Sequence, residues 1–135
     1  MPAQAGIFAD DLARCMVRTT TEADRHAMLR WLISSISVHP VLKSMITVSA
    51  EQSKAANQDA ALLMERLLTV SCKAEAQQAL RSEGGDVLGY SFGQLGQIAG
   101  RELSNDPAVA QKMQEYMQVV DAKKIQEALA PEEKR

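Results

Sequence analysis

The sequence predicts an all-α protein, and three observations support this fold class. The composition is dominated by good helix formers such as Ala, Leu, Met, Gln and Glu, whereas only 4% of the residues are aromatic. Apolar residues recur at three- and four-residue steps through most of the chain. No stretch shows the alternation that half-buried strands require. We therefore expect a single compact bundle of about six helices, including one long central helix, over residues 1–130, with a charged, frayed tail at 131–135.

The first half of the chain is predicted to contain three helices. Residues 6–18 form an amphipathic helix that ends at a run of three threonines, which favour helix ends over helix interiors. A capping box at Thr19–Glu22 or at Thr21–Asp24 then begins a second helix, which reaches about Ser37. Pro40 is suited to the first turn of a third, short helix, because the N–H that proline lacks would be unpaired there.

The second half is predicted to contain the long central helix and two others. A capping box at Ser49–Gln52 precedes a tract with a heptad-like apolar seam, which either continues to Ser82 or kinks near Ser71–Cys72. A fifth helix is expected at 86–103, and Asp106–Pro107 begins a sixth. The residues expected in one buried core are Trp31, Leu32, Ile36, Leu63, Leu67, Phe92 and Met117.

A row of glycines in the fifth predicted helix is the most unusual feature of the sequence. Gly85, Gly89, Gly93, Gly96 and Gly100 are separated by 4, 4, 3 and 4 positions. At about 100° per residue they project within a single stripe roughly 80° wide. Each glycine inside a helix costs about 1 kcal/mol relative to alanine, so a further interaction should offset the sum.

Three interpretations of this row are open. The glycines can let another helix of the same bundle approach closely, they can form a groove for self-association or a partner protein, or they can admit a ligand against exposed backbone. On the second interpretation we predict an interaction face formed by Gly85, Gly89, Phe92, Gly93, Gly96 and Gly100.

Signals for catalysis or metal binding are weak. We interpret His26 as a half-buried or solvated residue of a helix, and His39 as a residue of a helix cap or a loop. Neither histidine has the sequence spacing of a metal ligand. The segment Gly89–Gly93 reads Gly-Tyr-Ser-Phe-Gly, which matches the nucleophile motif of hydrolases but lacks the strand that must precede it. We expect no enzymatic activity, no metal and no cofactor.

The charge and the cysteine content indicate which classes of partner and which cellular compartment to expect. The net charge is −2 and no segment is strongly basic, so nucleic-acid binding is not expected. Cys15 and Cys72 are interpreted as two buried thiols, although a single disulfide stays possible. The uncharged stretch 31–42 is too short and too polar to span a membrane, and the N-terminus lacks a basic leader. These features predict a cytoplasmic protein.

The sequence thus favours a non-enzymatic protein–protein interaction or adaptor module. We expect this module to self-associate through the glycine-striped helix at 85–103, or to bind a partner protein there. The alternative is a helical regulatory domain that holds a small apolar ligand between its helices.

Overall fold

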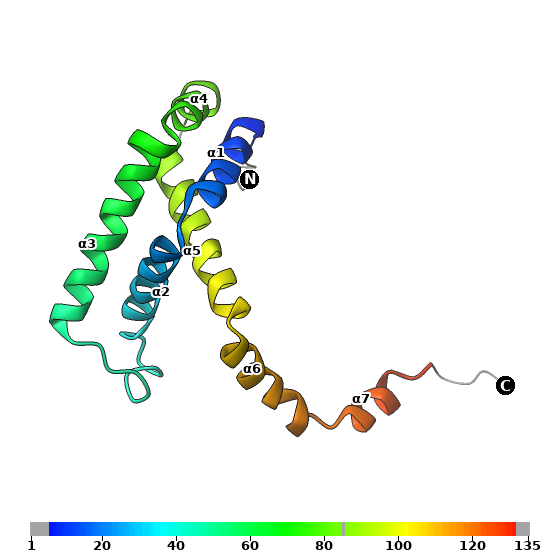
Figure 1. The fold of residues 1–135 in the computed structure, drawn as a ribbon. Coiled ribbons are helices and arrows are strands. Elements are labelled where there is room, and N and C mark those ends of the chain that lie inside the picture. Colours follow the sequence, from blue (N-terminus) through cyan, green and yellow to red (C-terminus); the bar gives the residue numbers. More distant parts are fainter. Residues whose placement is uncertain (1–5, 85, 132–135) are drawn as a thin grey trace. The chain divides into compact units, whose positions relative to one another are not determined.

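The computed structural model describes residues 6–84 and 86–131, and this part of the chain is helical with no strand (Figure 1). The predicted all-α fold class is therefore confirmed. The chain divides into two compact units, residues 1–103 and 104–135, and we describe each by itself. The helices are α1 (Ile7–Thr19), α2 (Glu22–Ile36), α3 (Ala50–Arg66), a π-helical turn η1 (Leu67–Ser71), α4 (Lys73–Glu83), α5 (Val87–Asn105), α6 (Pro107–Val119) and α7 (Ala122–Leu129).

The start of α2 is fixed by the second of the two capping boxes left open by the sequence, Thr21–Asp24, and the start of α3 by the predicted box Ser49–Gln52. Thr21 Oγ1 accepts from the backbone N–H of Asp24 at 3.1 Å, and Asp24 Oδ2 accepts from the N–H of Thr21 at 2.9 Å. Ser49 and Gln52 form the same reciprocal pair at 3.0 and 2.9 Å. Each box satisfies two N–H groups that the first helical turn leaves unpaired. The two helices then pack side by side (Figure 1).

The prediction of a short third helix after Pro40 is wrong. Residues 37–45 form successive turns instead, and residues 46–49 have no regular structure. Val41 and Met45, which are four residues apart and would share the apolar face of such a helix, are 68% and 77% exposed. His39 Nδ1 also accepts from the N–H of Val41 at 3.1 Å, a local bond that favours a turn. A helix this short is not stable without a buried face.

The long central helix is interrupted between Arg66 and Lys73. The N–H of Cys72 donates to the carbonyl of Leu67, five residues earlier, at 2.7 Å, and so ends a π-helical turn. Cys72 itself has a φ of −125° and is not helical. The chain therefore changes direction between α3 and α4, as π-turns commonly cause. Of the two alternatives left open by the sequence, a helix that continues to Ser82 and a kink near Ser71–Cys72, the structure has the kink.

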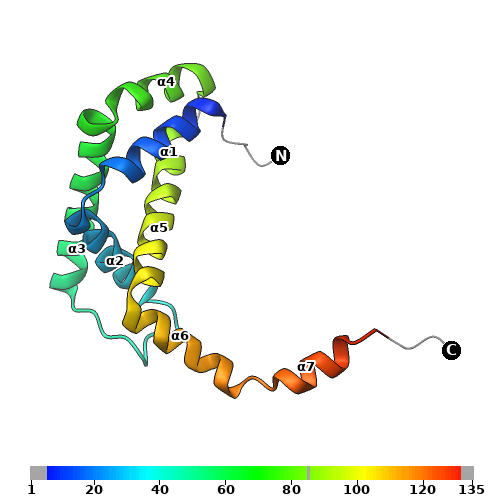
Figure 2. The same cartoon turned by 45° about the vertical axis from the view of Figure 1, so that its right-hand side comes forward.

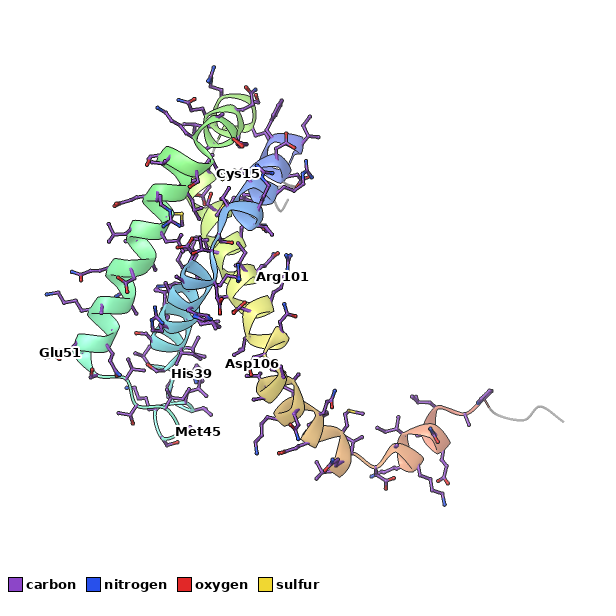
Figure 3. All side chains as sticks on the ribbon, in the orientation of Figure 1. Cys15, His39, Met45, Glu51, Arg101 and Asp106 are labelled. Carbon is purple, nitrogen blue, oxygen red and sulfur yellow. A yellow bond between two sulfur atoms is a disulfide. The ribbon has the colours of Figure 1, made fainter. Side chains whose placement is uncertain are left out.

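This bend brings together two cysteines that were interpreted as separate thiols. Because α1 packs on η1 and α4, Cys15 (labelled in Figure 3) and Cys72 come within a Cα–Cα distance of 5.9 Å and form a disulfide. Both residues are buried, as expected, with exposures of 1% and 0%. The interpretation as unpaired thiols is wrong, and the disulfide joins α1 to the junction of α3 and α4.

The core of the first unit contains part of the predicted set. Leu63 and Leu67 are buried, and Trp31 and Leu32 pack against the same cluster, which also contains Leu12, Met16, Met28, Leu95, Ile98 and Ala99. Ile36, Phe92 and Met117 are wrongly assigned to the core, because they are 39%, 51% and 61% exposed.

The second unit contains two helices where one was predicted. Asp106 Oδ1 accepts from the N–H of Val109 and begins α6 with Pro107 in its first turn, as expected. A second cap, Asp121 Oδ1 on the N–H of Lys124 at 2.9 Å, begins α7. Neither helix contains a buried residue. Met113 and Met117 are therefore exposed on α6, which explains why Met117 is absent from the core.

Candidate functional site

The described part of the glycine row lies on a face of α5 that no other helix of the first unit covers. A Cβ atom placed on Gly93, Gly96 or Gly100 would have no heavy atom within 4 Å. At Gly89 its nearest neighbours would be the carboxylate atoms of Asp86, which caps the start of α5 by accepting from the N–H of Gly89 at 2.7 Å. The interpretation that this row packs inside the bundle is therefore wrong. Gly85, also predicted for this face, lies outside the described residues.

Exposed apolar side chains border the glycine row. Phe92 is 51% exposed and Leu88 is 64% exposed. The Phe92 ring is held edge-on against Trp31 of α2, with ring centroids 4.8 Å apart and an interplanar angle of 85°. This aromatic pair gives Phe92 a fixed position at the margin of the row. We call Leu88, Gly89, Phe92, Gly93, Gly96 and Gly100 the α5 face.

Ion pairs tie α2 to the helices beside it and so orient α5. Arg25 Nε donates to Glu102 Oε2 at 3.0 Å, and His26 Nε2 lies 3.4 Å from Glu102 Oε1. On the other side of α2, Arg66 of α3 donates to Asp24. Burial raises the pKa of Asp24, but the N–H of Thr21 and the Arg66 guanidinium outweigh it, so this pKa is lowered. Through its contact with Glu102, His26 takes part in holding α2 against α5.

Helices α1 and α5 contribute residues to one buried cluster and line one surface depression, and charged residues of α1 affect Tyr90 of α5. Burial, Asp10 and Glu83 raise the pKa of this phenol, and the Arg14 guanidinium opposes them. Charged residues of α1 therefore lie close to α5, and Figure 2 shows α1 lying across α5.

The contact between α1 and α5 also places three arginines together, Arg14, Arg18 and Arg101, around one surface depression. Sequence reasoning missed this cluster, because only the four-residue spacing of Arg14 and Arg18 is visible in the sequence.

A second candidate site is an apolar pocket of about 550 Å³ within the first unit. Its walls come from α2, the irregular segment 46–48, α3 and Leu103 near the end of α5. The lining side chains are Leu29, Arg30, Ile33, Ser34, Ile46, Thr47, Val48, Gln52, Ala55, Ala56, Asp59 and Leu103. A mainly aliphatic lining with a few polar groups is typical of small-molecule sites of this volume.

The hydrolase-like motif at Gly89–Gly93 lies inside α5, not on a turn between strand and helix. Ser91 is fully buried, and its hydroxyl has no hydrogen-bond partner in the described structure. A buried serine on a continuous helix cannot serve as an exposed nucleophile. Within residues 6–84 and 86–131, no group of three or more His, Cys, Asp or Glu side chains is arranged to hold a metal ion.

Comparisons with known protein families, curated proteins and solved structures give no match for this chain. None of the helices described is long and apolar enough to cross a membrane.

Proposed function

We propose that this chain is a non-enzymatic protein–protein interaction or adaptor module that self-associates through the α5 face. The proposed module acts without a metal or cofactor, and its partner is a second copy or another protein, not nucleic acid or a membrane. The observation that carries the proposal is the open space above Gly93 and Gly96.

The energetics of α5 support this assignment. Four described glycines occupy one face of the helix, and each costs about 1 kcal/mol relative to alanine. Packing within the first unit does not offset this cost, since a Cβ atom on Gly93 or Gly96 would meet no neighbouring atom within 4 Å. A second backbone lying along the row would gain close dispersion contacts. Phe92 and Leu88 would then lose water-exposed apolar surface as well.

Sedimentation velocity over a range of protein concentrations tests the proposal. We expect a concentration-dependent dimer for the parent chain and a dissociation constant at least tenfold weaker for Gly96→Leu, because a bulky side chain separates the helices. Ala61→Leu, at an exposed position of α3, is the matched control and should leave association unchanged. A parent chain that stays monomeric at every concentration would contradict self-association.

The apolar pocket supports a second candidate function, a regulatory domain that binds a small apolar ligand. Its volume of about 550 Å³ suits such a ligand. Ala55→Leu would place a larger side chain in the pocket, whereas Ala61→Leu on the same helix lies outside the lining. If an environment-sensitive apolar dye binds the parent chain and Ala61→Leu but not Ala55→Leu, this function is supported. Equal dye binding by all three proteins would contradict it.

We propose a cytoplasmic location, which the redox state of Cys15 and Cys72 in cells can test because the two residues form a disulfide in the structure. Disulfides persist in oxidising compartments and are rare in the cytosol, where they are mostly transient. Alkylation of thiols in intact cells, followed by mass measurement, decides the question. Two alkylated cysteines support the cytoplasm, and two protected cysteines indicate an oxidising compartment.

A further inference from the structure

A shallow depression between α1 and α5 contains three of the arginines of the chain. It has a volume of about 460 Å³ and is lined by Ala13, Arg14, Val17, Arg18, Gln94 and Arg101. All six residues belong to the first compact unit. Figure 3 shows Arg101 on the side of α5 that is turned away from α3.

The positive charge of this depression is largely uncompensated. Arg14 pairs with Asp11 three residues earlier, and both side chains are at least half exposed, at 67% and 50%. Within residues 6–84 and 86–131, no carboxylate pairs with Arg18 or Arg101, whereas Arg25 and Arg66 each have a carboxylate partner. Arg14 and Arg18 are also four residues apart on one helix, where like charges repel. A bound anion would relieve this repulsion.

The surroundings of the guanidinium groups favour carboxylates of a protein over a single phosphate. Compact phosphate sites commonly use backbone N–H groups at a helix N-terminus. The residues here belong to the middle and last turns of α1 and α5, so neither of these two helices presents its N-terminus to the site. Guanidinium groups pair well with carboxylates, and the side chains of Ala13 and Val17 offer apolar contact to a peptide.

Two further observations indicate the chemical class of the partner. The net charge of −2 disfavours a nucleic acid, which needs a widespread basic surface. The depression also borders the α5 face, since Gln94 and Arg101 project about 80–100° around the helix from Gly93. A peptide segment lying along α5 can therefore reach the arginines.

We propose that Arg14, Arg18 and Arg101 form a docking site for an acidic segment of a protein partner, which places its carboxylates on these guanidinium groups. This inference rests on the proposed role in protein–protein binding, for which it names the chemistry of the partner. It does not require that the chain self-associates.

The test uses a fluorescently labelled helical peptide with glutamates along one face, and a matched peptide with glutamines there. Fluorescence anisotropy at about 0.15 M salt measures binding to the full chain. We expect the glutamate peptide to bind at least tenfold more tightly than the glutamine peptide. Arg18→Gln combined with Arg101→Gln should weaken its binding by about tenfold. The charge-matched control, Lys54→Gln with Arg81→Gln, should change binding by less than about twofold, because these residues lie outside the depression.

Three results would overturn the inference: equal binding of the two peptides, equal weakening by the two double variants, or tighter binding of tripolyphosphate or duplex DNA at the same arginines. Sedimentation velocity on the same proteins separates this inference from the proposed self-association. A monomeric parent that binds the glutamate peptide refutes self-association alone. A dimeric parent that does not bind it refutes the acidic partner alone.

Discussion

Glu83, the last residue of α4, caps the start of α1 through Phe8, which lies 75 positions earlier in the chain. Glu83 Oε1 accepts from the N–H of Phe8 at 2.8 Å and from that of Ala9 at 3.3 Å. The residue that precedes α1 is Gly6, which has no side chain to cap the helix. The carboxylate therefore satisfies N–H groups of the first turn and lies at the positive end of the helix dipole. Together with the Cys15–Cys72 disulfide, it holds α1 at two points.

Removing this cap should destabilise the fold. We expect Glu83→Ala to lower the free energy of unfolding by about 1 kcal/mol, within the range measured for helix caps. Glu83→Gln keeps an acceptor oxygen and should lose less. Urea unfolding followed by circular dichroism measures both. Glu65→Ala, which removes an exposed acidic side chain from α3, is the control. A loss for Glu65→Ala as large as that for Glu83→Ala would show that general charge, not capping, is responsible.

The disulfide should be a major source of stability. It closes a loop with a sequence separation of 57, for which chain entropy gives about 4 kcal/mol. We expect a reductant to lower the free energy of unfolding by about 2–4 kcal/mol in urea titrations. The double variant Cys15→Ala, Cys72→Ala should be less stable by a similar amount and insensitive to the reductant. If reduction leaves the parent unchanged, the bond contributes nothing to the folded state.

Asp24 should make stability depend on pH in the acidic range. Its pKa in the folded protein lies below the ordinary value of 3.8, so its ionised form stabilises the fold at pH values above that value. This contribution is lost as the pH falls through the lowered pKa. Asp24→Asn keeps an acceptor for the N–H of Thr21 but loses the charge that pairs with Arg66. We expect this variant to be about 1 kcal/mol less stable at pH 7 and nearly equal to the parent at the acid end of the titration. A difference that stays constant with pH would exclude the ionic contribution.

Removing the hydroxyl group of Ser91 should stabilise the protein. Its hydroxyl is fully buried without a partner in the described structure, and such a group costs about 1–3 kcal/mol. Thermal unfolding of Ser91→Ala should therefore occur at a higher temperature than that of the parent. Ser37→Ala is the contrasting variant, because Ser37 Oγ donates to the carbonyl of Ser34 at 2.7 Å. That change should lower the melting temperature, and the same sign for both variants would refute this account.

Local signals in the sequence predicted most of the helix boundaries, and tertiary contacts determined the rest. The boxes at Thr21–Asp24 and Ser49–Gln52 involve residues three positions apart, so they are readable from the sequence alone. The second cap at Asp121 carried the same kind of signal but was missed. The disulfide depends on how a π-turn directs α4 toward α1, which no local pattern contains. The arginine cluster likewise requires that Arg101 meet Arg18 across two helices.

Substitutions at Gly93 distinguish an exposed helix surface from a subunit interface. Because a Cβ atom on Gly93 meets only open space, both Ala and Leu fit the isolated chain. In a monomer each should stabilise α5, by up to about 1 kcal/mol, through higher helix propensity. In a dimer that packs through the α5 face, Leu should separate the helices and cost about 1–3 kcal/mol of association, whereas Ala is small enough to be tolerated. Thermal melts at a low and a high protein concentration measure the difference. We expect Gly93→Leu to melt above the parent at the low concentration and below it at the high one. If Gly93→Leu melts above the parent at both concentrations, the α5 face is exposed to water and self-association through it is excluded.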